Sequence, residues 1–385
     1  MIDKKVEDIT IKDINQLLND DVVENRFLEY KREIDGGKYR NDEFLADFVA
    51  FANSSGGDLI IGIEEGKGSD KGKPIAIVGI PIKSIEDDRI ALNNTIRDKV
   101  YPRFMDFEVR YIDLNNGNYI VIIRIKQSWN KPHMINGASR DFFVRNTTGK
   151  HAMDISEIKN SIFATQTVRE QMIEFMKNRL CNIISSSIND IVIKESPRIV
   201  VHLIPFASFS EDTPSIPINA MEAYSNKNSD YAIQNRINFD GKFILNNDGH
   251  AEGFTQLFRN GIVEYVKAVP VNQSTVKLFN PIIFKEIFQN IDSFLQYLSA
   301  SKIDVPIRLS ISLIGFRGIG LSSRNTLNQK IGKTIDRDLI TLPDISITDY
   351  NVDIMNFLND SLSIISNAFG MTDIGWEELL GWSQN

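Results

Sequence analysis

Residues 42–65, DEFLADFVAFANSSGGDLIIGIEE, place the tightest constraint on how this chain can fold. Apolar residues recur at helical spacing from Phe44 to Phe51, and Asn41 and Asp42 supply a cap at the start. The Ser-Ser-Gly-Gly that follows ends the helix, and its glycines suit a turn with positive φ. The apolar run after the turn predicts a buried strand. The chain must therefore pass from helix to strand through one tight glycine turn.

The residues before this helix predict a strand that carries an acid and a base on one face. In FLEYKREI, at 27–34, Glu29 and Lys31 alternate with Leu28 and Tyr30. Side chains two apart on a strand project from the same face. Glu24 lies five residues before Glu29, so it cannot share that strand face and must bend back from the preceding turn.

The remaining pattern predicts an α+β protein with two domains and a linker helix. Helices are expected at 9–19 and 84–100, and strands at 106–113 and 119–126, separated by the turn signal NNGN. We expect one mixed domain over residues 1–160, a linker helix over 161–190, and a second α+β domain over 191–385. The second domain contains β-branched and aromatic strand-like segments and an amphipathic helix that begins at Asn280-Pro281.

Composition excludes several classes of protein. The 385 residues suit two domains, and the formal net charge of −8 gives no basic footprint over the whole chain. A single cysteine, Cys181, forbids an intramolecular disulfide and favours a reducing compartment. No signal region or membrane-length apolar run is visible, so we expect a cytoplasmic protein without membrane contact. GFRGIGL at 315–321 lacks the Lys-Ser/Thr of a P-loop, so nothing indicates ATP.

Five segments, taken together, resemble the Schlafen-type AlbA-like domain of prokaryotic proteins over roughly residues 20–160. In order, they are ENRFLEYKREI, FLADFVAFANSSGGDLIIGIEE, VYPRF, KPHM and DFFVRNTTGKHAMDISEI. The resemblance implies nucleic-acid binding. In some members of the family, three carboxylates form a metal-dependent ribonuclease site that acts on structured RNA such as tRNA. Bacterial members often occur in helix-turn-helix regulators and in antiviral defence proteins.

Transferred to this sequence, the resemblance places the two first-strand acids at Glu24 and Glu29. The third acid falls on Glu64, with its neighbour Glu65 as the alternative, where catalytic members carry an aspartate. The implied cofactor is Mg²⁺ or Mn²⁺, held by Glu24, Glu29 and Glu64.

The chemistry supports the same candidates independently. Carboxylates are hard oxygen ligands for such ions, and a metal-bound water is a nucleophile for phosphodiester hydrolysis. Lys31 beside Glu29 would steady the attacking water or the developing negative charge. The simpler interpretation of Glu-x-Lys is a solvated strand face with an ion pair.

Nucleic-acid contacts are predicted around the first strand and near the end of the matched region. Arg145 and Lys150 in FFVRNTTGK offer charge for phosphate oxygens, although Arg145 paired with a neighbouring acid is the alternative. Arg32, Lys38 and Arg40 are further candidates for backbone contacts.

The leading hypothesis is a metal-dependent nuclease, acting on RNA in preference to DNA, in antiviral defence. Its second domain would recognise a trigger, a defence partner or another copy of the chain. One rival is a non-catalytic nucleic-acid-binding module or regulator. The other is an oligomeric scaffold, in which the acids only support the fold.

Overall fold

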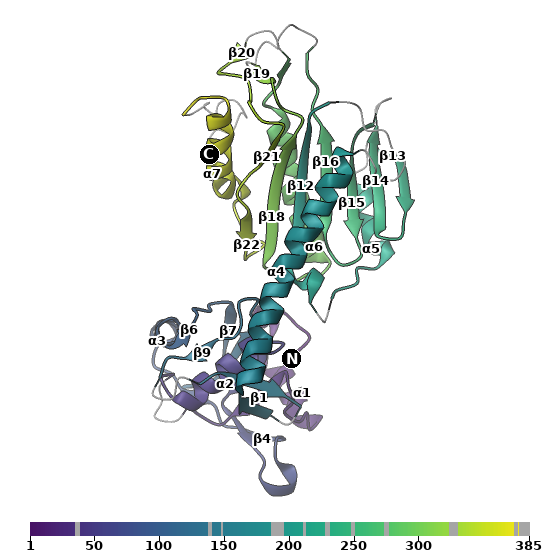
Figure 1. Ribbon diagram of the computed structural model, residues 1–385. Coiled ribbons are helices and arrows are strands. Elements are labelled where there is room, and N and C mark those ends of the chain that lie inside the picture. The colour runs from purple at the N-terminus through teal and green to yellow at the C-terminus, as the bar shows by residue number, and fades with distance from the viewer. Residues whose placement is uncertain are drawn as a thin grey trace. The chain divides into compact units, whose positions relative to one another are not determined.

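The computed structural model describes residues 1–34, 39–137, 141–147, 149–185, 196–210, 213–227, 232–247, 251–272, 277–322, 330–372 and 376. Two compact units, Met1–Thr167 and Val168–Asn385, divide the chain. The helix α4 (Ile155–Ile184) begins in the first unit and ends in the second. Both units combine helices and strands, as Figure 1 shows, which confirms the α+β class.

The N-terminal unit is built on a five-stranded mixed sheet. Its first two strands, β1 (Leu28–Lys31) and β2 (Gly57–Ile61), are parallel, and β2 pairs with β8 (Asn118–Ile125) in antiparallel fashion. The strands β7 (Phe107–Asp113) and β5 (Ile80–Pro81) also pair with β8. The smaller pairs are β3 (Ile63–Glu65) with β4 (Pro74–Ile77), β6 (Val100–Tyr101) with β9 (Met134–Ile135), and β10 (Phe143–Asn146) with β11 (Gly149–Ala152).

Alternation along the central strands separates two apolar cores, one on each face of this sheet. Leu59 and Ile61 face a core formed with α2 (Asp42–Asn53) and α3 (Ile85–Lys99), while Ile60 faces the core that includes Ile14 of α1 (Ile11–Asn19). The short helices η1 (Val6–Asp8) and η3 (Gly68–Asp70) complete this unit. In β1, Leu28 and Tyr30 are buried and Glu29 and Lys31 are half-buried, which confirms the predicted alternation.

Side-chain caps explain where the main helices of this unit begin. The Asn41 side chain accepts a hydrogen bond from Glu43 N at the start of α2, and Ser84 accepts one from Asp87 N at the start of α3. At α4, Asp154 and Glu157 each accept a hydrogen bond from the other's backbone N–H, at 2.8 and 2.9 Å. This reciprocal box starts α4 at Ile155, earlier than residue 161, where the sequence pattern placed the linker helix.

The C-terminal unit contains an eight-stranded antiparallel sheet in the order β13-β14-β15-β16-β12-β18-β21, with β22 also paired to β18. The strands are β12 (Arg198–Pro205), β13 (Ala232–Ile237), β14 (Gly241–Asn247), β15 (Ala251–Phe258), β16 (Val263–Ala268), β18 (Ile307–Ile314), β21 (Leu339–Thr341) and β22 (Ile345–Ile347). A smaller sheet joins β17 (Leu278–Phe279), β19 (Gly320–Ser322) and β20 (Lys330–Ile331).

Helices cover both faces of the large sheet. The C-terminal half of α4 packs against one face through Met172, Met176 and Leu180. The helices α6 (Ile283–Ala300) and α7 (Ile354–Ala368) pack on the other face. The unit also contains the 3-10 helix η4 (Phe206–Phe209) and the helix α5 (Ile218–Lys227). Figure 1 shows α4 crossing the strands of this unit, with α6 behind them. Within the described part of the chain, no helix has the length and hydropathy of a membrane span.

A buried polar cluster fixes α4 to this sheet. Arg179 donates to both oxygens of Glu264, at 2.8 and 2.5 Å, and His202 Nε2 lies 2.9 Å from Glu264 Oε2. Glu264 and His202 are fully buried and are cross-strand partners. Although burial raises it, the hydrogen bonds from Arg179 and His202 lower the pKa of Glu264 to about 2. The carboxylate is therefore ionised inside the sheet.

Replacing Glu264 is expected to destabilise the C-terminal unit strongly. Glu264→Ala leaves the Arg179 charge buried without its partner, which typically costs about 3–5 kcal/mol in the free energy of unfolding. Urea unfolding of the full chain, followed by circular dichroism, measures the change. Glu174→Ala, on the exposed side of α4, is the control, and equal effects of the two substitutions would contradict a stabilising role for the cluster.

Candidate nucleic-acid site

The candidate site is centred on Asp47, a fully buried carboxylate in the middle of α2. Three cations surround it. Lys150 Nζ lies 2.9 Å from Oδ1, Lys31 Nζ lies 3.4 Å from Oδ2, and Arg145 Nη1 lies 3.7 Å from Oδ1. Burial raises the pKa of Asp47 above its ordinary value, and Lys31 and Lys150 act in the opposite direction. Without such partners, a buried carboxylate charge would cost several kcal/mol. The cations that β1, β10 and β11 supply therefore allow an aspartate at this position.

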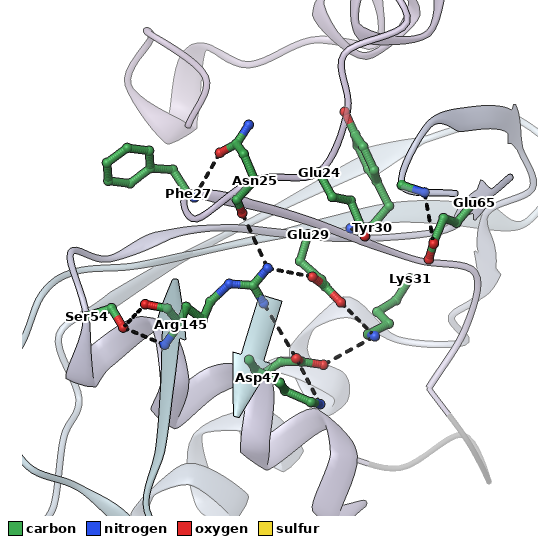
Figure 2. A network of polar contacts seen from close by, with 12 residues as sticks. Glu24, Asn25, Phe27, Glu29, Tyr30, Lys31, Asp47, Ser54, Glu65 and Arg145 are labelled. Atoms are coloured by element: carbon green, nitrogen blue, oxygen red, sulfur yellow. Dashed lines mark hydrogen bonds and ion pairs between the residues drawn. The ribbon is translucent and has the colours of Figure 1, made fainter. Parts of the chain in front are cut away.

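Glu29 shares two of these cations. Its Oε1 lies 2.8 Å from Lys31 Nζ, and its Oε2 accepts a hydrogen bond of 2.7 Å from Arg145 Nη2. Figure 2 shows the continuous network of Glu29, Lys31, Asp47 and Arg145. Although burial raises it, Lys31 and Arg145 hold the pKa of Glu29 below its usual value. Against the effect of burial, Asp47 and Glu29 raise the pKa of Lys31, so this ammonium stays charged.

Glu24 lies beside the network but makes no ion pair with the described residues. Its Oε1 accepts a hydrogen bond of 2.7 Å from Tyr30 N, so the side chain bends back over β1 from the preceding turn, as expected. Burial and the nearby Glu29 charge raise the pKa of Glu24 to about 7. The site therefore holds two neighbouring carboxyl groups with opposite pKa shifts.

The end of α2 positions Arg145. The Asn53 amide donates to the carbonyls of His133 and Phe143, both at 2.8 Å, and Ser54 Oγ accepts a hydrogen bond of 2.8 Å from Arg145 N. These contacts fasten β10 against the helix end. The guanidinium of Arg145 also lies over the Phe51 ring, 4.4 Å from its centroid.

The glycine turn after α2 permits this close packing. Gly56 has a φ of +73°, as the sequence predicted for the turn. A Cβ at Gly57 would lie 2.3 Å from the Phe51 ring and 2.7 Å from the Phe27 carbonyl oxygen. A side chain at residue 57 would therefore displace the ring on which Arg145 rests.

Residues 24–154 match the family model described as Schlafen, AlbA_2. This segment is a Schlafen/AlbA-like domain. Among solved structures, the chain is similar to the N-terminal domain of a RecG-related protein from Nitrosomonas europaea, determined by solution NMR. The identity is 17%, the TM-score is 0.27, and the match covers 34% of this chain and 82% of that one. The comparison with curated proteins gave no match.

The Schlafen/AlbA-like domain brings together Glu24, Glu29, Lys31, Arg145 and Lys150 of the predicted site residues. Glu64 makes a separate ion pair, in which its Oε1 lies 2.6 Å from Arg32 Nη1. Of the two candidates for the third acid, it is Glu65 whose negative charge adds to that of Glu29 in raising the pKa of Glu24. Gly72 connects Glu65 to Glu24: its N–H donates to Glu65 Oε1 at 3.0 Å, and its carbonyl oxygen accepts from Glu24 N at 2.7 Å.

The predicted nucleic-acid contacts differ in exposure. The Arg145 side chain is only 2% exposed and serves as an internal ion-pair partner, the alternative that the sequence left open. Lys150 is half-buried, whereas the Arg32 side chain is 56% exposed and Arg40 is exposed. Lys38 lies outside the described residues.

The predicted metal ligands do not form a ligand set in this arrangement. Both Glu29 oxygens contact cations, and Glu24 and Glu64 have the separate partners given above. Over the described ranges, no group of three or more His, Cys, Asp or Glu side chains is placed to hold a metal ion. Lys31 and Arg145 each contact one Glu29 oxygen.

Asp47 was not singled out from the sequence, although a signal was present. It is an acid within FLADFVAFAN, a helix whose residues 44–53 are all buried. A charge at such a position requires partners, and the basic residues Lys31, Arg145 and Lys150 of the resembling segments are those partners.

Removing the Asp47 carboxylate is expected to destabilise the Schlafen/AlbA-like domain. Asp47→Ala leaves an excess of buried positive charge, with an expected loss of about 3–5 kcal/mol in the free energy of unfolding. Thermal and urea unfolding measure the effect, and Asp3→Ala, at an exposed position, is the control. A loss of unfolding free energy no larger than that of Asp3→Ala would show that Asp47 does not stabilise the network.

Glu24 is expected to make stability fall as the pH rises. Its pKa is about 7 in the folded protein against an ordinary 4.5, so the folded state keeps a proton that the unfolded chain releases between these values. Glu24→Gln should therefore raise the free energy of unfolding by about 1–2 kcal/mol near pH 8, after allowance for solvent screening, and change it little near pH 4. Urea unfolding at the two pH values tests this, with the exposed Glu86→Gln as control. An equal gain in the free energy of unfolding at both pH values would contradict a raised pKa of Glu24 as its cause.

Proposed function

We propose that the Schlafen/AlbA-like domain binds nucleic acid, with RNA preferred over DNA. The observation that carries the proposal is that the whole ion-pair network, from Glu29 to Lys150, and the neighbouring Glu24 lie inside the segment matched by the family model. The exposed Arg32 and Arg40 and the half-buried Lys150 supply cations for phosphate oxygens. The chain's net charge of −8 makes a local basic surface, not the whole protein, the source of affinity.

Cleavage of the bound RNA is the second candidate function, and one observation favours it. Glu24 and Glu29 are neighbouring carboxyl groups whose pKa values are shifted in opposite directions. Such pairs are typical of general acid–base sites, where one group stays ionised and the other exchanges a proton near neutral pH. In this proposal Glu24 transfers the proton, and Glu29 stays charged while it positions Lys31.

The finer parts of the proposal follow the family resemblance. tRNA is the first RNA to test, and Mg²⁺ or Mn²⁺ is the cofactor to test with it. Antiviral defence is the proposed setting, with the C-terminal unit recognising a trigger or a partner. An oligomeric scaffold remains the alternative if the domain binds no nucleic acid, and the mass of the protein in solution addresses it.

Binding is expected to depend on the exposed basic residues. Fluorescence anisotropy with labelled tRNA, and with matched single- and double-stranded DNA, measures the affinity at several salt concentrations. Arg40→Gln should weaken RNA binding by about 3–10-fold and reduce the salt slope by about one. Lys12→Gln, an exposed substitution on α1, is the matched control. Equal affinities of both variants and the parent protein would remove Arg40 from the interface.

Cleavage is tested in parallel with end-labelled tRNA in Mg²⁺, Mn²⁺ or EDTA. Glu24→Gln and Glu29→Gln should each abolish cutting while RNA binding and the circular dichroism spectrum are retained, and Glu86→Gln should behave as the parent. Binding without cutting in every condition would reject the nuclease and leave the binding domain. Cutting that survives both substitutions would exclude these two carboxylates as its source.

A further inference from the structure

The C-terminal unit contains a pocket of ≈ 440 Å³ that the proposed function does not use. Its lining residues come from the segment that follows β16 and from the first turns of α6. This volume is within the range of small-molecule sites, which are mostly apolar with a few polar groups. The lining residues are Val269, Pro270, Asn280, Ile282, Ile283, Lys285, Glu286 and Gln289.

One side of the pocket is apolar. Val269 and Pro270 follow β16, and Ile282 and Ile283 begin α6 opposite them. Ile282 is 47% exposed, which leaves a large apolar side chain facing solvent at the pocket. An apolar ligand group that covers the exposed surface would remove it from water, which favours binding.

The polar side of the pocket carries an excess of positive charge. Glu286 Oε1 pairs with Lys267 Nζ at 2.8 Å and lies 3.3 Å from the Tyr265 hydroxyl. Lys267 thus neutralises the one carboxylate among the lining residues. Lys285 is half-buried, and its ammonium group has no hydrogen-bond or ion-pair partner within the described part of the chain. One ammonium is left without a counter-charge beside an apolar wall.

We propose that this pocket binds a small organic anion with an apolar body, such as a medium-chain carboxylate. The anionic group pairs with Lys285, and the hydrocarbon covers the exposed Ile282 and Pro270. The exposed Gln289 adds a hydrogen-bond donor to the lining. This ligand site is independent of nucleic-acid binding by the other unit.

Isothermal titration calorimetry with the full chain tests the proposal. The probes are octanoate, the neutral octan-1-ol and the cationic octylammonium. Octanoate should bind with a stoichiometry of one and more tightly than the other two. Lys285→Gln should weaken octanoate binding by about 10–100-fold, the usual range for one charge-assisted hydrogen bond. Lys177→Gln, an exposed helical lysine on α4, should leave the affinity unchanged.

A second variant tests the apolar wall without relying on Lys285. Ile282→Asp places a negative charge at the exposed rim of the pocket, so octanoate binding should be lost while the unfolding transition is retained. No heat with octanoate at millimolar concentration, preference for octylammonium, or equal effects of Lys285→Gln and Lys177→Gln would each overturn the proposal. Binding of a peptide with an acidic C-terminus but not of octanoate would reject the small ligand in favour of a protein partner.

Discussion

The buried charge of Asp47 organises the N-terminal unit. An aspartate with no exposed surface is tolerated only where cations replace its water, and here they come from β1, β10 and β11. The strand β1 lies near the start of the domain, whereas β10 and β11 lie near its end. The need to neutralise one carboxylate therefore ties the last strands of the domain to the first strand and to α2. Apolar packing alone would leave the placement of β10 and β11 less specific.

The same cations explain why two neighbouring glutamates differ. Lys31 and Arg145 contact Glu29 as well as Asp47, so Glu29 is ionised throughout the neutral range. Among the described residues, Glu24 has only the Tyr30 backbone N–H as a hydrogen-bond partner of its side chain, and the negative charges of Glu29 and Glu65 raise its pKa. Its proton is therefore exchangeable at neutral pH. The site therefore combines a permanently ionised carboxylate, Glu29, with a carboxyl group that exchanges its proton near neutral pH, Glu24. The difference arises because Lys31 and Arg145 contact Glu29 and not Glu24.

Much of the fold followed from periodicity, whereas the detailed site did not. The two-residue alternation in β1 and the helical pattern ending at Ser-Ser-Gly-Gly predicted β1, α2 and the turn, because each depends on local backbone geometry. The choice between Glu64 and Glu65 could not be made locally, since the pairing of β3 with β4 shifts register between these two residues. Such a bulge redirects side chains, and it is set by the partner strand. The burial of Arg145 likewise depends on α2, which lies far away in the sequence.

The contact between Phe51 and its neighbours carries a consequence for how this domain can vary among relatives. The ring supports the Arg145 guanidinium at 4.4 Å and lies where a Cβ at Gly57 would be. A change at any one of the three positions alters the space or the charge that the other two require. Positions 51 and 145 should therefore covary, because a smaller residue at 51 removes the aromatic surface that favours arginine at 145. Such a residue would relieve only one clash at position 57, since the Phe27 carbonyl oxygen also lies 2.7 Å from a Cβ there. The glycine and the arginine, 88 residues apart by number (145 − 57), are therefore linked through the side chain of one phenylalanine.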